Sequence, residues 1–77
     1  MKITIHLHGI GAEIANSSIL TVSGINNPEQ LRTYLGGTYP LFNKYLFQIA
    51  RNRELIKEKT SFENGDDIDI IFPFPFG

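Results

Sequence analysis

The two most apolar segments of the chain lie at its two ends, and this placement constrains the fold more than any other feature. In residues 1–8 the side chains alternate, with Ile3, Ile5 and Leu7 on one face and polar side chains on the other. This is the period of a strand with one buried face. Residues 68–72 form a nearly continuous apolar run, which is typical of a strand in the middle of a sheet. We therefore expect the first and last strands to be neighbours at the centre of one sheet.

The first half of the chain predicts a hairpin followed by a helix. Residues 19–23 are rich in β-branched side chains and predict a strand that pairs antiparallel with the first one across a loop. Asn27 suits the N-cap of a helix and Pro28 its first position. We expect this helix to run for about eight residues and to end at Gly36-Gly37, because glycine enters the left-handed C′ geometry freely. A helix this short must pack on the sheet to persist.

The second half predicts an aromatic connection and short strands. Residues 39–45 are expected to form a compact connection whose aromatic side chains close one end of the core. Residues 46–52 predict a strand, and residues 55–57 predict a shorter one after a tight turn at Asn52-Arg53.

The resulting order is β-β-α-β-β-β, which indicates an α+β fold of the ubiquitin-like β-grasp type. We expect a mixed sheet of four to five strands with one main helix packed on one face. A chain of 77 residues allows one domain, which we place at residues 1–72, followed by an extended C-terminal tail at residues 73–77.

Composition excludes several classes of function. Seven basic and eight acidic side chains give a net charge of −1, which argues against a nucleic-acid binder. The chain has no cysteine, so thiolate metal sites and thiol catalysis are excluded. Its apolar runs fall short of the ~20 residues of a membrane helix, so we expect a cytoplasmic protein with no membrane partner. So small a chain offers no room for an enclosed active site, and we expect no catalytic residue.

The tail is the most unusual segment of the sequence, and it consists of Pro73, Phe74, Pro75, Phe76 and Gly77. Each proline holds the residue before it in extended geometry and cannot donate to a sheet ladder. An extended tail of this length would reach roughly 16 Å beyond the sheet. It ends at a glycine, which has no side chain to obstruct an approaching active site.

The closing run of residues 62–77 resembles the end of the small sulfur carriers of molybdopterin and thiamine synthesis, the MoaD/ThiS family. Those proteins show a Gly-Asp acidic turn, an apolar strand, a proline-containing tail and a final Gly-Gly. Residues 50–54, Ala-Arg-Asn-Arg-Glu, are similar to the family's Ala-Val-Asn-Arg-Glu stretch. The helix at residues 28–35 and the chain length also match.

The resemblance implies that Gly77 is the covalent site. Its carboxylate would be adenylated by a ubiquitin-activating-like enzyme and converted to a thiocarboxylate, and a synthase large subunit is a possible later partner. ATP would be used by the activating enzyme, so this chain would bind no cofactor and no metal. The residues that would position Gly77 in a partner are Pro73, Phe74, Pro75 and Phe76.

Phe76 departs from the family pattern, because it stands where the carriers have their penultimate glycine. A phenyl ring is wide for a channel built to accept Gly-Gly. The alternative function is therefore a β-grasp protein-interaction module that has lost the carrier role. Both interpretations stay open at this stage, as does the pathway that would receive the sulfur.

Other polar groups have simpler interpretations. His6 and His8 lie on one strand face, where a metal would need further ligands, so we expect two polar residues on the outer face of the sheet. Asp66, Asp67 and Asp69 lack the ligand spacing of a calcium loop and indicate a solvated turn.

The positive charges leave two interpretations open. They could form a local patch for an acidic partner surface, or they could be long side chains that cover the sheet. The residues concerned are Arg32, Lys44, Arg51 and Arg53.

Overall fold

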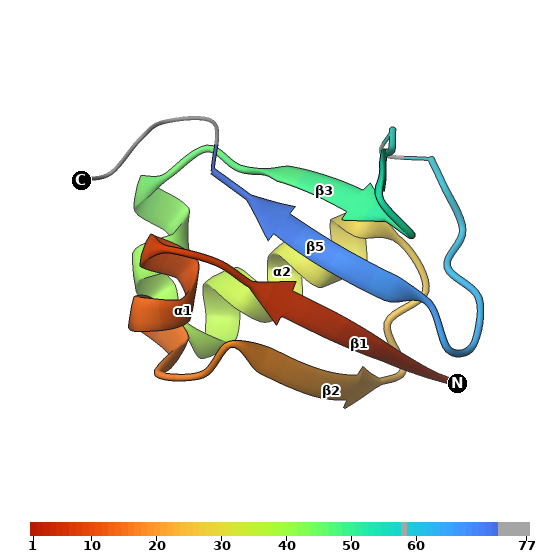
Figure 1. The fold of residues 1–77 in the computed structure, drawn as a ribbon, viewed down its shortest axis with the longest axis horizontal. Helices are drawn as coiled ribbons and strands as arrows, with labels where there is room; N and C mark the ends of the chain where they lie inside the picture. Colours follow the sequence, from red (N-terminus) through yellow and green to blue (C-terminus); the bar gives the residue numbers. More distant parts are fainter. Residues whose placement is uncertain (58, 73–77) are drawn as a thin grey trace.

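The computed structural model describes residues 1–57 and 59–72, and these form one mixed sheet with a helix packed across one face (Figure 1). The elements are β1 (Lys2–Leu7), α1 (Ile10–Ala15), β2 (Ile19–Ser23), α2 (Pro28–Thr38), the 3₁₀ helix η1 (Pro40–Lys44), β3 (Gln48–Arg51), β4 (Glu54–Leu55) and β5 (Asp67–Ile71). Within the described residues the sheet has five strands in the order β2-β1-β5-β3-β4. No helix in those two ranges is both long and apolar enough to cross a membrane.

The first and last strands form the centre of the sheet, as their apolar pattern predicts. β1 and β5 run parallel, with Ile5 opposite Ile68, and β1 also pairs antiparallel with β2. β3 joins the other side of β5 in antiparallel fashion and carries the short β4 at the edge. The predicted β-grasp architecture is therefore confirmed.

The core lies between the inner face of the sheet and α2. Alternate side chains of β1 and β5 point into it, and Ile5, Ile68 and Ile70 are fully buried. Burying each such side chain contributes roughly 1.5–3 kcal/mol, so the core supplies most of what holds so small a domain together. The buried hydrophobic cluster consists of Ile3, Ile5, Leu7, Val22, Ile25, Leu31, Leu35, Phe42, Ile49, Phe62, Ile68 and Ile70.

The loop predicted between the first two strands contains a helix, and the prediction of a plain loop is wrong. α1 has six residues and begins after Gly9, whose φ of 54° belongs to the left-handed region. It ends at Asn16, which is also left-handed with a φ of 54° and whose N–H bonds back to the helix. Gly9 permits this sharp entry, because glycine has no Cβ to clash there.

The start of α2 agrees with the sequence, but its end does not. The Asn27 side chain accepts a hydrogen bond from the Gln30 N–H at 2.8 Å, and Pro28 occupies the first turn. The predicted stop at Gly36-Gly37 is wrong, because the helix continues through both glycines to Thr38. The Asn43 side chain of η1 donates a hydrogen bond to the Gly36 carbonyl at 3.2 Å, which ties this last turn to the next element.

The two glycines of α2 are expected to respond differently to alanine. A Cβ at Gly37 meets nothing within 4 Å, whereas a Cβ at Gly36 would collide with the Asn43 side chain. Gly37→Ala should therefore stabilise the protein by about 0.5–1 kcal/mol, the usual gain in a helix interior. Gly36→Ala should be near neutral, since displacing Asn43 costs a hydrogen bond worth about 1 kcal/mol.

Chemical denaturation of both variants checks this prediction. In an Asn43→Ala background the collision and the hydrogen bond are both gone, so the two alanine substitutions should stabilise equally. An equal gain for both variants in the wild-type background would contradict the proposed contact.

Candidate functional site

The residues predicted to carry the function, Pro73, Phe74, Pro75, Phe76 and Gly77, lie outside the described residues. The structure does describe the point from which they continue, which is the end of β5. Phe72 follows the last residue of β5 and is the final described residue. The geometry around Phe72 therefore defines the base of the tail.

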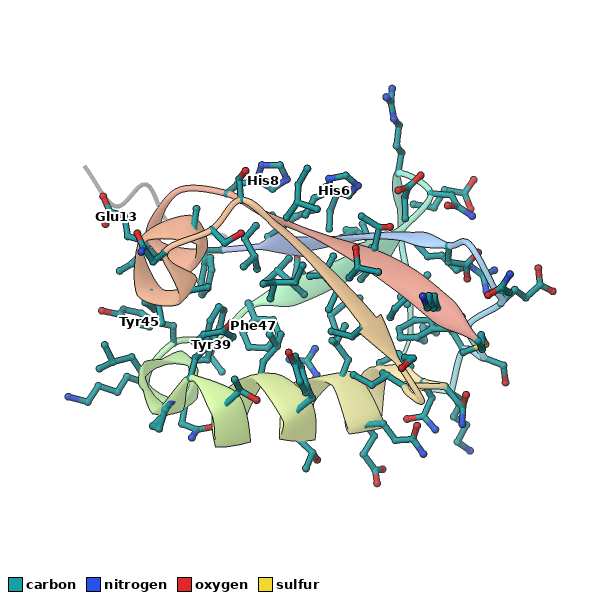
Figure 2. All side chains as sticks on the ribbon, turned by 90° about the horizontal axis from the view of Figure 1, so that it is seen from below. His6, His8, Glu13, Tyr39, Tyr45 and Phe47 are labelled. Carbon is teal, nitrogen blue, oxygen red and sulfur yellow. The ribbon has the colours of Figure 1, made fainter. Side chains whose placement is uncertain are left out.

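Phe72 is anchored in a cluster of aromatic rings. Its ring centroid lies 5.9 Å from that of Phe42, 5.9 Å from that of Tyr45 and 5.8 Å from that of Phe47. Ring pairs at such separations contribute about 0.5–1.5 kcal/mol beyond their burial. Tyr39 also packs on Phe42, and Figure 2 shows Tyr39, Tyr45 and Phe47 at the same end of the molecule as α1. The expectation that aromatic residues close one end of the core is confirmed, and we call these five residues the tail-base cluster.

α1 completes the cluster by a close approach. Gly11 is buried, and a Cβ at this position would lie 2.9 Å from a ring carbon of Phe72. Such a contact is shorter than side chains tolerate, so a residue without a side chain is needed for α1 to pack against Phe72. α1, which lies in the segment predicted to be a loop, thus supports the base of the tail.

The outer face of the sheet carries two histidine–aspartate pairs. His6 Nε2 lies 3.0 Å from Asp67 Oδ1, and His8 Nε2 lies 2.9 Å from Asp69 Oδ1. The pairing is diagonal, because His6 stands opposite Asp69 in the strand register. His6 and His8 point away from α2 in Figure 2, so their predicted position on the outer face is confirmed. A search of the described residues finds no group of three His, Asp or Glu side chains placed to share a metal ion.

A hollow of about 420 Å³ opens on this outer face. It is lined by His6, Asn52, Arg53, Asp67 and Asp69. The residues come from the two central strands and from the β3–β4 turn, so they are brought together by the parallel pairing of β1 with β5 and the antiparallel pairing of β3 with β5.

The two sequence motifs that carry the family resemblance contact each other. Asn52 donates its main-chain N–H to the Asp67 carbonyl at 2.8 Å, and its side-chain oxygen accepts the Asp67 N–H at 3.1 Å. The Asn52 amide also donates to Asp66 at 3.4 Å. Asp66 is only 6% exposed; its carboxylate accepts the Glu63 N–H at 2.8 Å and lies 3.9 Å from the Arg51 Nε. Together these contacts lock the β3–β4 turn onto the start of β5.

This network corrects the view of the acidic residues as one solvated turn. Asp67 and Asp69 face the outer side of the sheet, but Asp66 is buried and bonded to the main chain. The sequence contains both turns, Asn52-Arg53 and Gly65-Asp66. Their spacing along the chain does not show that they contact each other, so the burial of Asp66 was not predicted.

Asp66→Ala is expected to destabilise the domain by about 2 kcal/mol, because it removes a buried carboxylate and leaves the Glu63 N–H and the Asn52 amide without their acceptor. The neighbouring Asp67→Ala is the matched control. Its side chain is 62% exposed, and loss of an exposed pair costs less than about 1 kcal/mol. Urea unfolding of the two variants gives the comparison, and equal losses would show that the Asp66 network adds no stability.

The basic residues do not form one patch. Arg32 stacks over the Phe47 ring at 4.7 Å and donates to the Phe47 carbonyl at 3.2 Å, on the α2 side of the sheet. Arg51 donates to the Ser61 carbonyl at 2.7 Å. Arg53 instead lines the hollow on the outer face. The interpretation of separate side chains that cover the sheet and its connections is confirmed for Arg32 and Arg51.

Comparison with known proteins rests on structure. No family model matches the sequence, and no curated protein matches it. A Pyrococcus furiosus protein described as molybdopterin converting factor, subunit 1, superposes with a TM-score of 0.87 at 12% identity, covering 96% of this chain and 99% of that one. SAMP1 from Haloferax volcanii gives a TM-score of 0.79 at 19% identity, with all of both chains covered.

A third similar structure is the complex of subunits 1 and 2 of molybdopterin-converting factor from Helicobacter pylori. It gives a TM-score of 0.73 at 23% identity, again with complete coverage of both chains. These likenesses extend over 96% or more of the chain. The chain therefore has the ubiquitin-like β-grasp fold of the molybdopterin-converting subunits and the small archaeal modifier proteins.

Proposed function

We propose that this protein is a small sulfur carrier whose Gly77 carboxylate is adenylated by a partner enzyme and converted to a thiocarboxylate for cofactor synthesis. The observation that carries the proposal is the structural match to a molybdopterin converting factor subunit, at a TM-score of 0.87 over 96% of this chain. The closing sequence motif, which ends in a prolyl tail and a glycine, supports it independently.

The chemistry requires little of the carrier itself. A carboxylate is a poor electrophile, so attack of its oxygen on the α-phosphate of ATP forms an acyl adenylate and releases pyrophosphate. A sulfur nucleophile then attacks the acyl carbon, and AMP leaves. ATP and the catalytic groups would belong to the activating enzyme, and the carrier would supply the carboxylate and a surface to hold it in place.

The tail-base cluster suits this role. Phe72 is held by three rings and by α1, so the residue from which the tail continues has a defined position. Because Phe72 is held in place before binding, less conformational entropy is lost when the tail enters a partner. Exposed residues of the outer face, such as Ile19 and Leu55, would dock the adenylating enzyme.

A second partner would be a synthase large subunit. The Helicobacter pylori structure is a complex of subunits 1 and 2 of molybdopterin-converting factor. By analogy, the thiocarboxylate of this carrier would be consumed in such a complex, with either a molybdopterin-type or a thiamine-type product.

Intact-mass spectrometry tests the proposal. The protein is incubated with ATP, a sulfide donor and the adenylating enzyme encoded in the same genome. The expected result is an ATP-dependent mass increase equal to the replacement of one oxygen by sulfur, located at Gly77 by fragmentation. Absence of both adenylate and exchange with every such enzyme would overturn the carrier function and favour the interaction module, for which Phe76 is the supporting residue.

A further inference from the structure

Arg53 occupies a backbone position that disfavours arginine. Asn52 and Arg53 form the turn between β3 and β4, with φ values of 49° and 74°. Two consecutive left-handed residues define a hairpin turn in which Asn-Gly is the favoured pair. Asn52 fits this preference, but Arg53 stands where glycine would be least strained.

No described residue of the domain bonds to the Arg53 side chain. The turn is held by Asn52, through its main-chain and side-chain bonds to Asp67. Arg53 is exposed and makes no hydrogen bond or ion pair with any residue in the ranges 1–57 and 59–72. A side chain placed at a strained position without a local partner is a candidate for recognition of something outside the chain.

The surroundings of Arg53 define what it could recognise. It lines the hollow together with His6, Asp67 and Asp69, and each aspartate already accepts from a histidine. Arg53 is the lining side chain with no bond to a described residue, and its guanidinium binds oxyanions through paired N–H donors. The two aspartates disfavour a doubly charged phosphate more than a single carboxylate, because repulsion grows with the charge that is brought in.

An exposed apolar side chain, Leu55, lies two residues after Arg53. Leu55 is 62% exposed, and it stands opposite Ala50, which itself pairs with Asp69. Arginine is one of the residues enriched among those that dominate binding at protein interfaces, and the exposed Leu55 side chain offers apolar surface beside it. The combination favours a protein partner over a small anion.

We infer that Arg53 anchors the outer face of the sheet to a carboxylate side chain on the adenylating enzyme. The inference rests on the proposed function, since it assigns the residue by which that same partner is recognised. In this arrangement the tail delivers Gly77 to the reaction centre while Arg53 sets the orientation of the domain.

Binding of the full-length protein to the adenylating enzyme, measured by titration calorimetry, tests the inference. Arg53→Gly should weaken binding about tenfold or more, and Arg53→Lys should recover part of the loss because it keeps the charge but not the paired donors. Lys44→Gln, which removes a charge from an exposed position on η1, is the matched control and should bind as the wild type does. Raising the salt concentration should weaken the wild-type complex more than the Arg53→Gly complex.

Thermal unfolding separates recognition from structure. Arg53→Gly should raise the melting temperature, since it relieves the left-handed strain, while it lowers affinity. Equal affinity of wild type and Arg53→Gly, or an equal loss in Lys44→Gln, would overturn the inference while Gly77 activation of the wild type continued. If the wild type is not adenylated at all, the proposed function fails, and the Arg53 assignment fails with it.

Discussion

Phe42→Ala is expected to destabilise the protein by about 3–5 kcal/mol, the usual range for removing a buried phenyl ring. Phe42 is 1% exposed, and its ring contacts those of Tyr39, Phe47 and Phe72. A domain of this size has a total stability of roughly 4–12 kcal/mol. The variant should therefore be largely unfolded well below the wild-type melting temperature, and Phe42→Leu should recover most of the loss.

Leu41→Ala is the matched control for Phe42. It lies next to Phe42 in the same 3₁₀ helix but is 50% exposed, so its substitution should change stability by less than about 1 kcal/mol. Urea denaturation followed by circular dichroism measures both. Similar losses would show that burial in the tail-base cluster does not determine stability at this end of the molecule.

Deletion of Gly77 is expected to abolish activation under the proposed function. The deletion moves the terminal carboxylate back by about 3.3 Å and places it on Phe76. Displacements of about 1 Å already cost about a hundredfold in rate, so the ATP-dependent adenylation rate should fall by more than that. Pyrophosphate release with the adenylating enzyme measures the rate.

Phe76→Gly is the control for the deletion, since it keeps the carboxylate at residue 77. If the phenyl ring restricts entry to the channel of an enzyme that accepts Gly-Gly, this substitution should raise the rate with that enzyme. Neither change removes a residue of the described core, so both variants should melt as the wild type does. An undiminished rate after deletion of Gly77 would contradict its assignment as the covalent site.

The fold was largely predictable because burial imposes a period on the sequence. Ile3, Ile5 and Leu7 alternate as a half-buried strand requires, and the apolar run at residues 68–72 indicates a central position. The sequence could not show α1, because its six residues make fewer than two helical turns and do not display a recognisable helical period. The end of α2 was missed because each glycine costs a helix only about 1 kcal/mol, and contacts such as the Asn43 hydrogen bond to Gly36 offset it.

The candidate site was predictable in a different way. The tail residues through Gly77 came from a resemblance and lie outside the described residues, so they remain predictions. The Asn52–Asp66–Asp67 network was not predictable, because its partners lie 14 and 15 positions apart and only the sheet order brings them together. The strain at Arg53 was likewise invisible, since a predicted tight turn does not say which of its residues has a positive φ.

The parallel pairing of β1 and β5 has a consequence for how the protein forms. Thr4 pairs with Asp67, 63 positions later, so the centre of the sheet requires contact between the two ends of the chain. Proteins rich in such non-local contacts fold more slowly than helical ones. The core cannot close until β5 has joined β1, so a chain cut before β5 would present neither a stable domain nor an anchored Phe72. Closure of the core and anchoring of the tail base are thereby coupled in one event.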